Sequence, residues 1–209
     1  MSSVHAVLFD YGLVLCGPPD PAAWARMRAI TGFDEPTLQK AYWTPRHEYD
    51  RGTYTGQGFW LEAGRIGGVA LSDAQVEELI EADTDLWTQP NQPMIDWAAR
   101  LQAAGVKTGI LSNIGDAMEI GVRARMPWLA AFAHHTFSHN LKLAKPEQAI
   151  YRHAAEGLRT APEHILFIDD KPENVAAAHE AGMQALQYTD HAVFLRELAT
   201  LDPANLWTS

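Results

Sequence analysis

Four short, uninterrupted apolar runs constrain the fold of this sequence more than any other feature. Runs of this kind are typical of strands that are buried on both faces, as in a parallel sheet covered by helices. Helical patterns with start signals lie between and after them, for example at Pro146 and Pro172. The sequence therefore predicts an α/β fold, a parallel sheet flanked by helices. The four runs are AVLF (6–9), GIL (109–111), ILFI (165–168) and the weaker ALQY (185–188).

The first two runs are about a hundred residues apart, which is far too long for one crossover between parallel strands. A second structural unit must therefore be inserted between them. We predict a core domain formed by residues 1–16 and 91–209 and an inserted helical cap domain at 17–90. Residues 91–105 are expected to return to the sheet as a helix.

Helix start signals within the insert support its helical character. Asp20 precedes Pro21, Asp34 precedes Pro36, and Ser72 with Gln75 forms a capping-box pattern. The Gly- and Thr-rich segment RGTYTGQG (51–58) predicts a loop inside the cap.

Composition narrows the class of protein. With 47% apolar and 20% charged residues, the 209-residue chain has the composition of an ordinary globular protein. Its net charge of −10 argues against a broad nucleic-acid surface. No apolar run approaches the roughly 18 residues that span a bilayer, no N-terminal signal pattern is present, and the single Cys16 fits a reducing compartment. We expect a cytoplasmic monomer or homodimer without nucleic-acid or membrane partners.

Polar side chains follow the predicted strands where each strand ends. Asp10 follows the first run, Ser112 and Asn113 follow the second, and Asp169 with Asp170 ends the third. Ligands of open parallel sheets bind beyond the carboxyl ends of the strands. Each residue alone has an ordinary explanation as a turn or cap, but adjacent carboxylates repel unless a cation offsets them. The combination indicates an active site.

These residues, with Lys145, resemble the four motifs of the haloacid dehalogenase-like (HAD) hydrolase superfamily. The matching segments are LFDYGLVL, GILSN, LAKPEQAIY and ILFIDDKPENV. The resemblance covers nearly the whole chain. It is closest to the subgroup that contains bacterial α-D-glucose-1-phosphate phosphatase and the N-terminal phosphatase domain of soluble epoxide hydrolase. It implies a HAD-like Rossmannoid core and an Mg²⁺-dependent phosphatase whose partner is a small phosphorylated metabolite.

The resemblance also implies the nucleophile and the metal ligands. Asp10 would attack phosphorus and form an aspartyl-phosphate that water then hydrolyses. Mg²⁺ would be held by the Asp10 carboxylate, the Gly12 carbonyl and Asp170, with Asp169 acting through a bound water.

Three further residues would bind or balance the phosphoryl group. Ser112 and the backbone N–H of Asn113 would hold its oxygens, and Lys145 would offset the crowded negative charge. Asn174 would support the loop that carries the fourth motif.

Gly12 departs from the pattern. In most phosphatases of the superfamily the residue two after the nucleophile is a second Asp, which protonates the leaving oxygen and later activates water. Such acid–base help is typically worth 10²–10⁴-fold in rate. The leaving group could need less help, as does the anomeric hydroxyl of a sugar 1-phosphate. A water or a cap residue, with His47, Glu48 and Asp50 as candidates, could supply the proton. Otherwise the protein is a catalytically weak phosphate binder.

The cap is expected to select the substrate. Arg46 and Arg51 could meet a distal anion, and His47 and Tyr49 lie in the same RHEYDRG segment. Tyr49 and the other cap aromatics, Trp43, Tyr54 and Trp60, could stack on a sugar or aromatic group. The alternative is that these aromatic side chains form the cap's own core.

A 2-haloacid dehalogenase is the alternative enzyme. That chemistry also uses an aspartate nucleophile, but it needs no metal and gains nothing from two further anions. The Asp169–Asp170 pair therefore argues against it.

Overall fold

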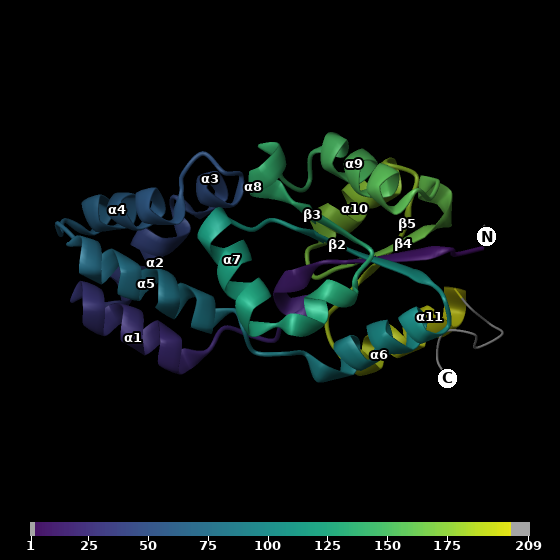
Figure 1. Cartoon of the computed structure of the whole chain (residues 1–209), viewed down its shortest axis with the longest axis horizontal. Coiled ribbons are helices and arrows are strands. Elements are labelled where there is room, and N and C mark those ends of the chain that lie inside the picture. Colours follow the sequence, from purple (N-terminus) through teal and green to yellow (C-terminus); the bar gives the residue numbers. More distant parts are fainter. Residues whose placement is uncertain (1–2, 202–209) are drawn as a thin grey trace.

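The computed structural model describes residues 3–201 of the chain (Figure 1). Five strands form one parallel sheet in the order β3-β2-β1-β4-β5. The predicted α/β fold with a parallel sheet is confirmed, and the four apolar runs lie on strands, except that Tyr188 of the last run follows its strand. The strands are β1 (Ala6–Phe9), β2 (Lys107–Ser112), β3 (His134–Phe137), β4 (Ile165–Asp169) and β5 (Gln184–Gln187).

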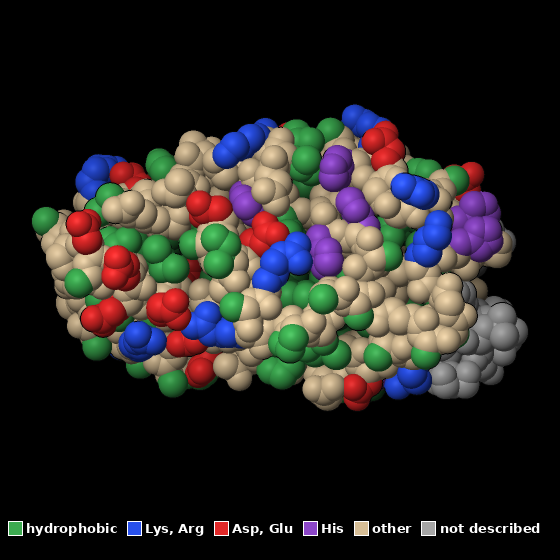
Figure 2. Space-filling view, viewed as in Figure 1, with side chains coloured by type: hydrophobic (Ala, Val, Ile, Leu, Met, Phe, Trp, Pro, Cys, Tyr) green, Lys and Arg blue, Asp and Glu red, His purple; other side chains and the backbone are tan. Residues whose placement is uncertain are grey.

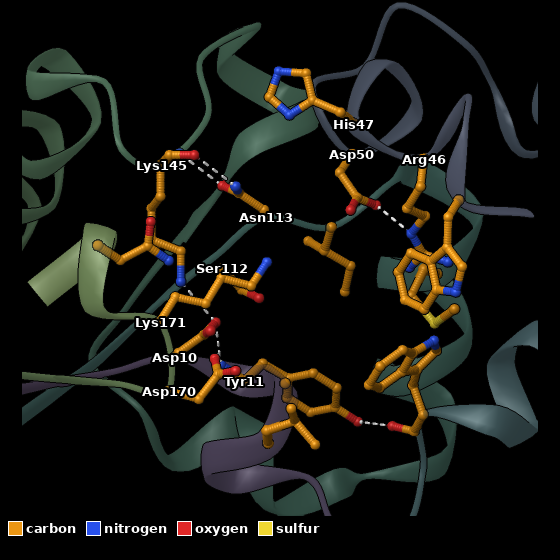
Figure 3. A pocket seen from close by; sticks show the side chains of 17 residues that line it. Asp10, Tyr11, Arg46, His47, Asp50, Ser112, Asn113, Lys145, Asp170 and Lys171 are labelled. Atoms are coloured by element: carbon orange, nitrogen blue, oxygen red, sulfur yellow. Dashed lines mark hydrogen bonds and ion pairs between the residues drawn. The ribbon is translucent and has the colours of Figure 1, made fainter. Parts of the chain in front are cut away.

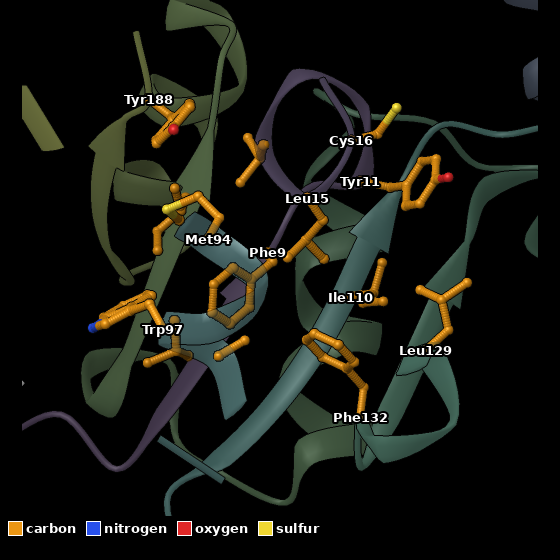
Figure 4. Close-up of a cluster of buried hydrophobic side chains, with 14 of the residues drawn as sticks. Phe9, Tyr11, Leu15, Cys16, Met94, Trp97, Ile110, Leu129, Phe132 and Tyr188 are labelled. Atoms are coloured by element: carbon orange, nitrogen blue, oxygen red, sulfur yellow. The ribbon is translucent and has the colours of Figure 1, made fainter. Parts of the chain in front are cut away.

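Both faces of the sheet are buried, which explains why the central strands are continuously apolar. Val7 and Phe9 of β1 point to one face, where α6 (Gln92–Ala103) and α11 (His191–Leu201) pack. Figure 4 shows Phe9 between Trp97 and Phe132 in this cluster. The alternate residues of β1 contribute to a second cluster, which α9 (Gln148–Leu158) and α10 (Pro172–Glu180) cover.

Three local features differ from the expectations. β3 has no apolar run because it is an edge strand whose His134 and His135 are partly exposed. Helix α9 begins at Gln148 rather than at Pro146, since Glu147 keeps an extended backbone. The predicted loop over 51–58 is wrong in its last three residues, which form the start of α4 because Thr55 caps that helix.

The insert is helical, as predicted. Its start signals act as expected: Asp20, Asp34 and Ser72 each accept a backbone N–H at a helix start, and Ser72 with Gln75 completes the capping box. These helices enclose a separate apolar core that includes Tyr42 and Trp60. They are α1 (Pro21–Thr31), α2 (Glu35–Trp43), α3 (Arg46–Asp50), α4 (Gly56–Gly67) and α5 (Asp73–Leu86).

The two segments that connect the insert to the sheet lie side by side. Cys16 and Pro90 form an antiparallel bridge, Gly17 N donates to the Gln89 carbonyl at 2.5 Å, and Asn91 N donates to the Leu15 carbonyl at 3.0 Å. This pairing supports the domain boundaries that we propose at 16/17 and 90/91. Cys16 itself is a buried free thiol.

The insert also contacts the core directly. Met118 N of α7 (Asp116–Arg125) donates to the Tyr49 hydroxyl at 3.2 Å, and Gly56 N donates to Asp116 at 2.8 Å. Ser138, the first residue of α8 (Ser138–Leu141), donates its hydroxyl to the Asp50 carbonyl. The helical unit is therefore held close against the ends of the strands.

Figure 2 shows acidic side chains gathered over the helical insert on this face of the molecule. Among residues 3–201, no helix combines the length and the apolar character needed to cross a bilayer.

We expect Asn91→Ala to destabilise the junction between the two units. The Asn91 amide donates to the Val14 carbonyl at 2.7 Å and to the Tyr188 hydroxyl at 3.0 Å. Its loss leaves the carbonyl of buried Val14 without this donor, so the free energy of unfolding should fall by about 1–3 kcal/mol. Urea denaturation measures this change. Gln92→Ala, which removes an exposed hydrogen bond on the same helix, is the matched control and should change stability by less than about 0.5 kcal/mol. Equal effects of the two substitutions would contradict the role given to Asn91.

Candidate active site

The sheet register brings the polar strand ends together. Phe9 pairs with Ile110 on one side and with Ile168 on the other, so Asp10 and Asp169 end neighbouring strands at the same level. Asp10 N donates to the Ile168 carbonyl at 2.8 Å, which continues the ladder by one residue. Because all these strands are parallel, their carboxyl ends form one edge.

Lys145 joins two of these carboxylates. Its Nζ lies 2.9 Å from Asp10 Oδ1 and 2.6 Å from Asp169 Oδ2, and all three side chains are almost completely buried. The Asn113 side chain fixes the backbone of Lys145: its Oδ1 accepts Lys145 N at 2.8 Å and its Nδ2 donates to the Lys145 carbonyl at 3.0 Å. The sequence predicted a role for the Asn113 backbone only, so this contact of its side chain was missed.

Asp169 is held by several donors. Besides Lys145, its Oδ1 accepts Lys171 N at 2.9 Å and Asn174 Nδ2 at 2.9 Å. The predicted support of this loop by Asn174 is thus seen as a direct hydrogen bond. Asp170 is less buried and lines a cavity beside Asp10.

Electrostatic crowding alters the acidity of these groups. Burial raises the pKa of Asp10 to about 7, with Lys145 opposing the shift and Asp169 adding to it. Burial and the charge of Asp169 also raise the pKa of Asp170. For Lys145, burial alone would lower the pKa, but the paired carboxylates outweigh it and the pKa is raised. One lysine therefore faces three carboxyl groups.

The same three carboxyl groups form a cluster that fits a divalent cation. One oxygen from each of Asp10, Asp169 and Asp170 lies within 4.8 Å of the other two. A hard cation such as Mg²⁺ prefers oxygen ligands, and its charge would offset the excess of carboxylates over lysine. The donor set therefore fits the predicted metal.

A wide helical turn, η1 (Tyr11–Leu15), follows Asp10. The Tyr11 hydroxyl donates to the Trp87 carbonyl at 2.7 Å, which ties this turn to the end of α5. Gly12 has ordinary backbone angles (φ −64°, ψ 132°), and a Cβ there would meet nothing within 4 Å. Neither backbone strain nor crowding requires a glycine at this position. Leu13, in contrast, adopts φ 58°, which is unusual for a leucine, and the residue is 38% exposed.

A cavity of about 350 Å³ separates the strand ends from the inserted helices (Figure 3). Its floor contains the predicted residues Asp10, Gly12, Ser112, Asn113, Lys145 and Asp170. Leu13, Ile114 and Met118 form an apolar part of the core side, and Trp43 with Trp87 adds aromatic surface from the insert. Three polar residues of α3 complete the lining: Arg46, His47 and Asp50.

The predicted cap residues lie in different environments. Arg46 lines the cavity but is mostly buried, and it pairs with Asp50 at 2.9 Å and with Asp83 at 3.2 Å. His47 also lines the cavity and is exposed to solvent.

Tyr49 and Arg51 do not line the cavity. Tyr49 is buried in the core of the insert, where it stacks on Phe59, and Trp60 lies in the same core. The Arg51 guanidinium pairs with Glu147 of the core domain.

Several lining residues were not identified from the sequence. Leu13, Trp87, Ile114, Met118 and Lys171 carry no signal beyond their closeness to a motif, because apolar residues on helices and loops read as core. Leu13 and Lys171 each stand beside a motif carboxylate, and this adjacency was the only available indication.

Comparisons with known proteins identify relatives of this chain. The sequence model of the haloacid dehalogenase-like hydrolases matches residues 6–182. Bifunctional epoxide hydrolase 2 of Sus scrofa is 30% identical over 94% of this chain, and the match spans 38% of that protein. The sesquiterpene phosphatase astK of Aspergillus oryzae is 29% identical over 54% of this chain and 58% of its own length.

A solved structure has the same fold. A HAD family enzyme from Bacteroides thetaiotaomicron, crystallised with magnesium and inorganic phosphate, superposes with a TM-score of 0.73. The two are 20% identical, and the match covers 92% of this chain and 99% of that one. At this identity the likeness shows the fold alone. The family match over most of the chain is decisive, and the protein belongs to the haloacid dehalogenase-like hydrolases.

Proposed function

We propose that this hydrolase is an Mg²⁺-dependent phosphatase of small phosphomonoesters and that Asp10 is its nucleophile. The observation that carries the proposal is the buried cluster of Asp10, Asp169 and Asp170 with Lys145 bound to two of its members. The sesquiterpene phosphatase relative and the magnesium and phosphate complex of the Bacteroides enzyme support it.

Asp10, the Gly12 carbonyl and Asp170 would hold the metal. Asp169 already accepts three hydrogen bonds from Lys145, Lys171 and Asn174, which suits the water-mediated role proposed for it. When bound, Mg²⁺ supplies positive charge that neutralises the phosphoryl oxygens and the carboxylates.

The residues of the chain have distinct roles in the reaction. An Asp10 oxygen attacks phosphorus and displaces the leaving oxygen, and the resulting aspartyl-phosphate is then hydrolysed by water. The Ser112 hydroxyl and the Asn113 backbone N–H hold phosphoryl oxygens during both steps. Lys145 positions Asp10 and balances the negative charge, as phosphoryl transfer requires.

Two substrate classes are favoured by different observations. The acidic anomeric hydroxyl of a sugar 1-phosphate suits an enzyme with Gly12 in the first motif. A terpenyl or alkyl monophosphate is the second candidate, because Leu13, Trp43 and Trp87 line the cavity with apolar surface. This candidate is supported by the name of the sesquiterpene phosphatase.

The competing functions have less support. A 2-haloacid dehalogenase gains nothing from the clustered carboxylates of Asp169 and Asp170, which fit a cation. A catalytically weak phosphate binder would not need Asp10 paired to a buried lysine at 2.9 Å.

We expect Asp10→Asn to lower phosphate release from any hydrolysed monoester by more than about 1,000-fold. The amide keeps the shape of the side chain but is a poor nucleophile. Colorimetric phosphate detection with and without Mg²⁺ measures the effect. Asp73→Asn, which alters an exposed carboxylate of α5, is the control and should leave the rate unchanged. Full activity of Asp10→Asn would remove the nucleophile assignment.

Asp170→Asn should raise the Mg²⁺ concentration that gives half-maximal activity by at least about tenfold. The substitution removes one of the negatively charged ligands, and even outer-shell changes cost 10–100-fold in metal affinity. Calorimetric titration of Mg²⁺ into wild type and variant measures the same loss without turnover. Unchanged Mg²⁺ affinity would show that the cation binds elsewhere.

A panel of phosphomonoesters should separate the two substrate classes. Leu13, Trp43 and Trp87 form what we call the apolar wall of the cavity. If this apolar wall binds the leaving group, Trp43→Ala should raise KM for a terpenyl monophosphate by about tenfold or more. The same substitution should change KM for glucose 1-phosphate much less, because a sugar buries less apolar area. Steady-state kinetics with both substrates distinguishes these outcomes, and equal changes would remove the apolar wall from substrate selection.

A further inference from the structure

Asp50 is the carboxylate of the insert that faces the strand ends across the cavity. It ends α3, and Figure 3 shows its side chain directed into the cavity on the side opposite Asp10 and Asp170. Its backbone carbonyl accepts the Ser138 hydroxyl from the core domain. This contact fixes the end of α3 relative to the core.

Among the described residues, a donor contacts only one of the two Asp50 oxygens. Oδ1 accepts Arg46 Nε at 2.9 Å, and no donor within residues 3–201 contacts Oδ2. The side chain is 15% exposed, and the residue lines the cavity. The second oxygen is therefore available to a ligand in the cavity.

The charges around Asp50 favour its binding a proton. Arg46 is shared between two carboxylates, because its Nη1 also lies 3.2 Å from Asp83 Oδ1. One guanidinium and two carboxylates leave an excess negative charge in a mostly buried network. Burial raises the pKa of Asp50 to about 6, with Arg46 opposing the shift, Asp83 adding to it and Lys171 opposing it. An acid in this range can both give and take a proton near neutrality.

The other two candidate proton donors, Glu48 and His47 of α3, are placed less suitably for reaching a leaving group in the cavity. Glu48 accepts the Thr53 hydroxyl at 2.7 Å and does not line the cavity. His47 lines the cavity but is exposed to solvent. Asp50 is the carboxylic acid of the insert that both lines the cavity and is fixed by neighbours from two domains.

We propose that Asp50 donates the proton to the leaving oxygen, in place of the second aspartate that Gly12 replaces in the first motif. This inference rests on the proposed phosphatase function and assigns a catalytic residue within it. Crowding does not explain the missing aspartate, since a Cβ at Gly12 would meet nothing within 4 Å.

Asp50 gives a proton in the first step and regains one in the second, and water is the only other reactant. An Asp10 oxygen bonds to phosphorus while the bond from phosphorus to the leaving oxygen breaks, and that oxygen takes the proton of Asp50. In the second step a water oxygen bonds to phosphorus, Asp50 takes a water proton, and the bond to Asp10 breaks. Inorganic phosphate leaves, and both aspartates return to their starting states.

The test compares substrates whose leaving groups differ in their need for a proton. We expect Asp50→Asn to lower kcat/KM by about 100-fold for the poorest leaving group that wild type hydrolyses, the simple alcohol of an alkyl phosphate. For 4-nitrophenyl phosphate, whose phenolate leaves without a proton, the loss should stay within about threefold. Asparagine keeps an oxygen that can accept the hydrogen bond from Arg46 Nε, so the substitution should disturb the structure little. Any structural damage that remained would lower kcat/KM for both substrates by the same factor.

Two matched variants separate catalysis from structure. Glu48→Gln changes a carboxylate of the same helix that does not line the cavity, and it should leave the ratio of the two rates unchanged. His47→Gln should leave that ratio unchanged as well. Thermal denaturation of each variant monitors the fold.

A second substitution tests the proposal even if Asp50→Asn does not fold. Gly12→Asp in wild type should raise the rate on the poor leaving group by less than about threefold, because an acid is already present. Added to Asp50→Asn, it should restore most of the lost rate.

Three results would overturn the assignment. The first is an equal loss of kcat/KM with both substrates in a folded Asp50→Asn variant. The second is a gain of about 100-fold in the rate on the poor leaving group from Gly12→Asp alone. The third is a loss in His47→Gln that is much larger for the poor leaving group than for 4-nitrophenyl phosphate. A wild type that releases no phosphate from any monoester would overturn the proposed function as well, whereas equal losses in an active enzyme overturn this inference alone.

Discussion

A buried lysine between two buried carboxylates is the interaction on which the site depends. Removing these charges from water is costly, and the cost is offset only because Lys145 reaches both Asp10 and Asp169 within 3 Å. The third carboxyl group, Asp170, leaves the cluster with more negative than positive charge. That excess makes the cluster a site for a cation and an anionic phosphoryl group together, since each offsets the charge that the other brings.

The topology of the sheet supplies the positions that this charge balance needs. β1 lies between β2 and β4, so Asp10 stands between Ser112 and the Asp169–Asp170 pair. The Asn113 side chain then binds both backbone groups of Lys145, and Asn174 binds Asp169. The residues with charge are therefore held by neutral amides, which fix geometry without adding to the electrostatic imbalance. The insert contributes a different surface, in which two tryptophans, Trp43 and Trp87, lie beside the polar side chains of Arg46, His47 and Asp50.

The fold and the floor of the site were predictable from the sequence because both depend on local patterns. Apolar runs predict buried parallel strands, and the polar residue after each run must lie at the carboxyl edge. The surface contributed by the insert was less predictable: Arg46 and Tyr49 belong to the same helix, yet only Arg46 lines the cavity. Which side of a short helix faces a ligand depends on how helices pack on another domain, and no local pattern encodes that. The cavity-lining role of Trp87 was missed for a related reason, since a tryptophan at a helix end is expected to be a core residue from sequence alone.

The two connecting segments pair at Cys16 and Pro90, so the helical unit is joined to the α/β unit at one place. The chain enters and leaves it through adjacent backbone segments, and neither the strands nor the cluster of acids includes a residue of 17–90. A protein built in this way can keep its cluster of acids unchanged while the inserted helices change the rest of the cavity lining, including any proton donor that they carry. If Asp50 acts as proposed, an exchange of residues 17–90 between relatives would change the acid of the reaction as well as the surface that meets the substrate.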